Sequence, residues 1–136
     1  MASILKVDEM QGVTSAGDIT ITDGTTTMKM QVGIAKFYAL FELDSTQAIT
    51  DSFNAASITD DGTGKSELGF TSNMANATYI VTSNGVHDGG SYVGGTVVNH
   101  DSPPASSSVH MDFLKYGSEA AHDGELCCAT IHGDLA

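Results

Sequence analysis

Hydrophobic and polar positions alternate with a period of two over several stretches of the chain. Apolar side chains occupy every second position from Ala35 to Leu43 and again from Val109 to Phe113. A period of two places successive side chains on opposite faces of a β-strand. Aromatic and β-branched residues within such runs also favour strands. Because no long amphipathic helix is visible, the pattern predicts an all-β fold.

Turn signals separate these runs. Asp23-Gly24 and the segment 60–64 place glycine between β-type stretches, which is typical of hairpins. The central stretch, residues 51–81, therefore predicts a strand, a glycine turn, a second strand and a loop into a third. Further strands are expected at 96–99, 108–114 and 125–132, with 101–107 as a loop. Repeated short strands of this kind predict an antiparallel β-sandwich or jelly-roll-like barrel.

The same alternation predicts the hydrophobic core. We expect it to draw on Phe37, Phe41, Phe53, Ile58, Leu68, Phe70, Ile80, Met111, Phe113 and Ile131.

The chain divides into an N-terminal arm with a hairpin, residues 1–33, and a β-sandwich knob, residues 34–136. Residues 2–10 form a short extended run whose apolar members are Ile4, Leu5, Val7 and Met10. A two-stranded hairpin is only marginally stable alone. We therefore expect these four residues to anchor the chain by adding a strand to the sheet edge of a partner. The alternative is that the run pairs with its own knob.

Charge excludes one class of partner. The chain has 17 acidic residues against five lysines and no arginine, for a formal charge of −12. This charge repels a phosphate backbone, so no nucleic-acid partner is expected. The sequence shows neither a signal-peptide pattern nor an apolar run long enough to span a membrane. Cys127 and Cys128 are adjacent and point to opposite faces of a strand, which fits free thiols and synthesis in a reducing cytoplasm.

The motifs of common enzymes and zinc sites are missing from the sequence. Its acidic candidates for glycoside hydrolysis lie on separate segments, at Glu42, Glu67, Glu119 and Glu125. The sequence therefore predicts neither an enzyme nor a cofactor.

His-Asp pairs recur in or beside loops, at His87-Asp88, His100-Asp101 and His122-Asp123, and His110 and Asp112 share a strand face. They could bind a metal on a symmetry axis, but polar loop residues are the simpler interpretation, so no metal is predicted. Tyr92, among glycines, and His100 are candidates for a receptor-contacting loop. Tyr92 could equally close the end of the sandwich.

The central stretch also carries a family resemblance. It contains Ser52-Phe53-Asn54, Ser57-Ile58-Thr59-Asp60, Gly62-Thr63-Gly64 and Phe70-Thr71, followed by Met74, Ala77 and Tyr79. This pattern resembles a domain of tail-fibre-type proteins of marine bacteriophages. The segments 3–8, 13–19 and 36–41 are similar to the same family, so the likeness covers roughly the first 80 residues. The segment 86–108 lies outside it.

The resemblance implies a non-enzymatic structural protein on the virion surface, made in the host cytoplasm and assembled as a homotrimer. It implies a short tail fibre or knob that binds other virion proteins and contacts the host surface, including its glycans. The chain length, with little room for a shaft, favours the alternative of a capsid decoration or head-fibre protein. A carbohydrate-binding module is a third class, since a β-sandwich alone does not exclude it.

Overall fold

A computed structural model describes residues 19–23, 26–29, 33–86, 93–99, 101–116 and 120–136, and the elements of these residues are ten strands. The chain divides into two compact units, Met1–Ile34 and Ala35–Ala136. In the first unit, β1 (Thr20–Asp23) pairs with β2 (Thr26–Lys29) in antiparallel fashion. Asp23 lies opposite Thr26, as expected of a hairpin around Asp23-Gly24.

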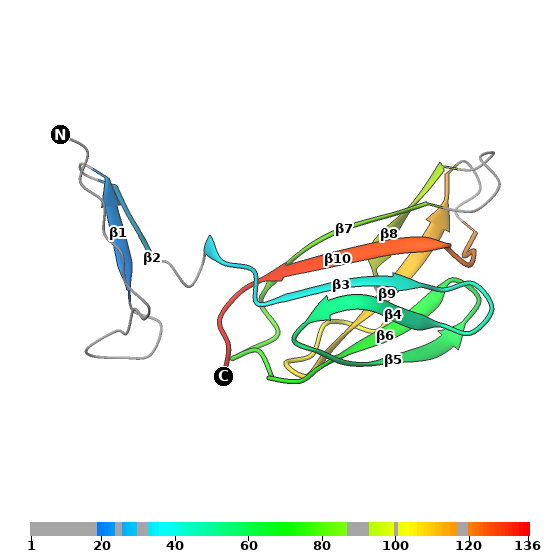
Figure 1. The fold of residues 1–136 in the computed structure, drawn as a ribbon, viewed down its shortest axis with the longest axis horizontal. Helices are drawn as coiled ribbons and strands as arrows, with labels where there is room; N and C mark the ends of the chain where they lie inside the picture. Colours follow the sequence, from blue (N-terminus) through cyan, green and yellow to red (C-terminus); the bar gives the residue numbers. More distant parts are fainter. Residues whose placement is uncertain (1–18, 24–25, 30–32, 87–92, 100, 117–119) are drawn as a thin grey trace. The chain divides into compact units, whose positions relative to one another are not determined.

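The second unit is a single antiparallel sheet of eight strands in the order β4-β3-β10-β7-β8-β9-β6-β5. The prediction of an all-β antiparallel fold is therefore confirmed. The strands are β3 (Phe37–Glu42), β4 (Ala48–Phe53), β5 (Ala55–Gly62), β6 (Lys65–Phe70), β7 (Ile80–Val86), β8 (Val93–Val98), β9 (Ser108–Lys115) and β10 (Leu126–His132). The sheet curls until its edge strands β4 and β5 lie near one another, so it is nearly closed (Figure 1).

The first and last strands of this unit are neighbours, because β3 pairs along β10. The backbone N–H of Lys36 donates to the carbonyl of Ile131 at 2.8 Å, just where the chain enters β3. The chain therefore enters and leaves the unit at the same end (Figure 1).

The core lies inside the curled sheet and is built from alternate residues of its strands. Seven of the expected core residues are buried: Phe37, Phe41, Leu68, Phe70, Met111, Phe113 and Ile131. Ile58 is partly buried against them. Each strand thus contributes one of its two faces, as the period of two requires.

The prediction of burial is wrong for two residues, because Phe53 is 52% exposed and Ile80 is 70% exposed. Phe53 lies opposite Tyr38, and Ile80 lies opposite His132. Residues directly opposite in a ladder share a face of the sheet, and here that face is the outer one. Alternation identifies the two sets of side chains but does not say which set turns inward.

The sequence did not predict all of β4, whose residues 50–52 are polar. Its end is fixed by Asn54, which has a φ of 63° between β4 and β5. Asparagine tolerates this left-handed conformation better than most residues. The Asn54 side chain donates to the carbonyls of Lys36 and Ser72 at 3.0 Å and accepts from the Ser72 N–H at 2.7 Å. These bonds hold the sharp corner between the two strands.

Phe113 occupies a tight slot in the core. It is fully buried on β9. A Cβ added at Gly85 or at Gly124 would lie 2.9 Å from its ring. Both glycines therefore approach the ring near its Cδ2 atom, which leaves no room there for an additional methyl group.

Candidate interaction surface

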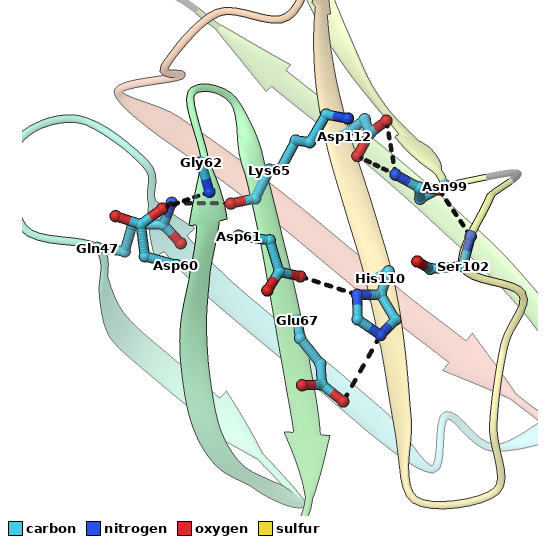
Figure 2. A network of polar contacts seen from close by, with 10 residues as sticks. All are labelled: Gln47, Asp60, Asp61, Gly62, Lys65, Glu67, Asn99, Ser102, His110 and Asp112. Atoms are coloured by element: carbon cyan, nitrogen blue, oxygen red, sulfur yellow. Dashed lines mark hydrogen bonds and ion pairs between the residues drawn. The ribbon is translucent and has the colours of Figure 1, made fainter.

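The outer side of β5, β6 and β9 carries a polar network (Figure 2). His110 on β9 lies opposite Glu67 on β6. The Nδ1 atom of His110 is 2.8 Å from Asp61 Oδ2, and its Nε2 atom is 3.7 Å from Glu67 Oε1. Asp61 reaches His110 because the β5–β6 register shifts between Asp60 and Gly62. An extra residue at such a bulge turns its side chain in a new direction.

The neighbouring carboxylates are also hydrogen-bonded within the chain. Asp60 accepts from the Gln47 amide at 3.0 Å and from the Gly62 N–H at 2.8 Å. Asp112 accepts from the Asn99 amide at 2.8 and 3.0 Å. These bonds join the carboxylates to neighbouring loops and strands (Figure 2), as expected of a polar face in contact with water.

The outer side of β4, β3, β10 and β7 has the opposite character. Tyr38 and Phe53 stack with ring centroids 6.4 Å apart and are 40% and 52% exposed. Val86 lies opposite Leu126, and they are 50% and 49% exposed. Leu40 lies opposite Cys128 on the same side of the sheet. We call the surface formed by these six residues the apolar face: Tyr38, Leu40, Phe53, Val86, Leu126 and Cys128.

The apolar face is hollowed between its strands. The hollow has a volume of about 120 Å³ and is lined by Leu40, Asn84, Gly85, Val86, Leu126 and Cys128. Apart from Glu42, Asp51 and His132, the residues that these four strands turn outward are uncharged. The face thus consists of an aromatic ridge at one side, formed by Tyr38 and Phe53, and an apolar hollow beside it.

The two cysteines occupy opposite sides of β10. Cys127 is buried in the core, whereas Cys128 is exposed on the apolar face. Burial, with a smaller contribution from the neighbouring Cys128, raises the pKa of Cys127 from 9.0 to about 12. Since the thiolate is the reactive form, Cys127 is unreactive near neutral pH and Cys128 is the accessible thiol.

The structure describes only some of the residues that the sequence singled out as candidate site residues. Ile4, Leu5, Val7, Met10, Tyr92, His100 and the pair His87-Asp88 lie outside the described residues, and so does Glu119. His110 and Asp112 share the polar face, but they bond to different partners. Asp123 has a structural contact, because its carboxylate accepts from the Gly64 N–H at 2.6 Å.

Glu42, Glu67 and Glu125 lie on β3, on β6 and before β10. In the part of the chain that the structure describes, no three His, Cys, Asp or Glu side chains gather as a metal site requires.

Sequence reasoning missed the apolar face, although a signal was present. Residues 37–41 read Phe-Tyr-Ala-Leu-Phe, so both faces of β3 are apolar. Near-continuous apolar runs are typical of strands covered on both sides. The inner side of β3 is covered by the core, and the second apolar side identifies a surface suited to association.

Within the described ranges, the structure contains no helix with the length and apolar character needed to cross a membrane. Comparisons of the chain with protein-family models, with curated proteins and with solved structures find no match.

Proposed function

We propose that the chain is a non-enzymatic structural protein of a bacteriophage virion surface, a short fibre or knob of the tail-fibre type. The observation that carries the proposal is the apolar face on an otherwise strongly acidic chain. An aromatic side chain can bury roughly 150–250 Å², so Tyr38 and Phe53 at their exposures leave on the order of 200 Å² open. With Leu40, Val86 and Leu126, the face reaches the ~300–600 Å² of the largest patches on monomeric proteins, which are often functional.

A face of this kind serves association rather than chemistry. It is made mainly of aromatic and aliphatic side chains. Its two carboxylates lie on one side of the face, Glu42 on β3 and Asp51, opposite Leu40, on the edge strand β4. Interface cores have the same composition, with aromatic residues enriched and charges depleted. The polar face, with its hydrogen-bonded carboxylates, suits the side of a particle component that remains in contact with water.

The resemblance to tail-fibre-type proteins supports the location. Under this proposal, Ile4, Leu5, Val7 and Met10 attach the chain to another virion protein, and the sheet of the second unit projects as a homotrimeric knob. Tyr92 and His100 belong to the side that contacts the host. Placement on the capsid as a decoration protein is the alternative within the same function.

Quantitative mass spectrometry of purified virions from the phage that encodes the chain tests the proposal. A few copies per particle, with antibody labelling at the tail, is the expected result. One or more copies per capsomer would place the protein on the capsid instead. Absence of the chain from washed virions would show that the proposal is wrong. Strong, selective binding on a glycan array by a chain absent from virions would favour a carbohydrate-binding module.

A further inference from the structure

We propose that the apolar face is covered by a second copy of this chain. The inference rests on the proposed function in that it names the partner of the surface through which the protein is assembled. The partner that we propose is a copy of the chain itself and not another virion protein, so the purified protein is sufficient for the test.

Charge is the first reason to expect a copy on this face. Each copy carries a formal charge of −12, so copies repel one another wherever their carboxylates meet. The polar face presents Asp60, Asp61 and Glu67 close together. The residues that line the hollow of the apolar face include no carboxylate, and Asp51 is the only acidic residue that lies opposite one of them, Leu40. Two copies therefore approach with the least repulsion through their apolar faces. A basic partner would be attracted to the polar face instead.

Shape is the second reason. An apolar surface is complementary to itself, because it needs no opposite charge on its partner. The face also holds both a ridge, Tyr38 with Phe53, and a hollow of about 120 Å³. An apolar cavity of about 150 Å³ can bind benzene, so the hollow is near the size at which it receives an aromatic ring from a neighbouring copy. If the ridge of one copy fits into the hollow of the next, the contact is head-to-tail. Such contacts form a closed ring when the rotation that relates neighbouring copies divides a full turn evenly.

Cys128 reports directly on whether the face is covered, because it lines the hollow and is exposed in the single chain. Cys127 serves as an internal control, since it is buried whether or not copies associate. The experiment treats the full chain at micromolar concentration with iodoacetamide and locates the label by mass spectrometry. Light scattering on the same sample gives the number of copies. We expect an oligomer in which both thiols resist alkylation until the protein is denatured.

Two valines provide a matched pair of variants. Val86 is on the apolar face and 50% exposed, whereas Val97 lies opposite Asp112 on the other half of the sheet and is 42% exposed. Replacing either valine by lysine changes the formal charge equally, from −12 to −11. Val86→Lys should weaken self-association by roughly tenfold or more, because it places an unpaired charge in the contact. It should also make Cys128 reactive. The Val97→Lys variant should have the same oligomeric mass as wild type, and its Cys128 should be protected from alkylation to the same degree.

The outcomes separate this inference from the proposed function. A monomeric wild type with freely alkylated Cys128 overturns the inference, and so do Val86→Lys and Val97→Lys variants that behave alike. If Cys128 is reactive in the purified protein but protected in virions, another virion protein covers the face, and only the inference fails. If the chain is missing from virions yet forms oligomers that protect Cys128, the inference stands and the proposed function fails.

Discussion

The slot around Phe113 gives a quantitative test of the core. A Cβ at Gly85 would lie 2.9 Å from Cδ2 and Cε2 of Phe113 and 3.1 Å from Sγ of Cys127. Gly85→Ala therefore overpacks the core, at a cost of about 1–3 kcal/mol. Alanine restricts the unfolded chain and recovers about 0.4–1 kcal/mol. We expect a net loss of about 1–2 kcal/mol in the free energy of unfolding.

Phe113→Leu removes the ring edge that obstructs this methyl group. Alone, it should cost about 1–2 kcal/mol, less than the ~3–5 kcal/mol of truncating phenylalanine to alanine. In the double variant the alanine methyl occupies part of the space that the ring vacates. The double variant should therefore lose about 1–2 kcal/mol rather than the sum of the two losses, a coupling of about 1–2 kcal/mol.

Urea unfolding followed by far-ultraviolet circular dichroism measures all four proteins of this cycle. The protein concentration must be the same throughout, because the stability of an oligomer depends on it. Gly95→Ala is the matched control: Gly95 is also on a strand, but an added Cβ there meets nothing within 4 Å. This control should be neutral or stabilising by up to about 1 kcal/mol. Additive losses, or a Gly85→Ala variant as benign as the control, would refute the packing described for Phe113.

Three further predictions concern the core, the response to pH and the arm. Phe70→Ala should cost about 3–5 kcal/mol in urea unfolding, because the ring packs at 5.1 Å from that of Phe37; a loss below about 1 kcal/mol would contradict its burial. Burial raises the pKa of Cys127 from 9.0 to about 12 and that of Tyr79 from 10.0 to about 12. From pH 9 upward the unfolded chain therefore releases protons that the folded chain retains, and the free energy of unfolding falls as the pH rises. Cys127→Ala should reduce this fall between pH 9 and 12 in urea titrations, and an unchanged slope would contradict it. Deleting residues 2–10 should leave a folded protein that no longer joins particles; normal incorporation would place the anchor elsewhere, and failure to fold would place the segment within the sheet.

Local pattern was sufficient to predict most of the strands, but not the whole of β4, the second half of β7 or the start of β8, and not the arrangement of the strands. The alternation through β3 and the turn between β5 and β6 were evident because strand period and turn chemistry are properties of neighbouring residues. The outward direction of the Phe53 side chain was not evident from the sequence, because it depends on the pairing of Phe53 with Tyr38. The strand β4 gave a weak signal, since its polar residues are stabilised as a strand by pairing with β3.

The candidate surface was still harder to predict. Val86 and Leu126 lie 40 positions apart in the sequence and meet only because β7 pairs with β10. The candidates that the sequence did offer, Tyr92 and His100, lie outside the described residues and stay predictions.

The adjacency of β3 and β10 determines how the second unit responds to mechanical load. A force applied between residues 35 and 136 would first load the bonds that join Asp134 and Ala136 to residues 73–75. It would then act at one end of the β3–β10 ladder and break its hydrogen bonds one after another, beginning near Phe37 and Ile131. Ladders opened in this unzipping geometry resist less force than ladders sheared along their length, where all bonds are loaded together. A knob held only by the segment before β3 and pulled from the opposite end, at the β5–β6 turn, is loaded along its strands instead. The second unit is therefore expected to resist less force between residues 35 and 136 than along the axis of its strands.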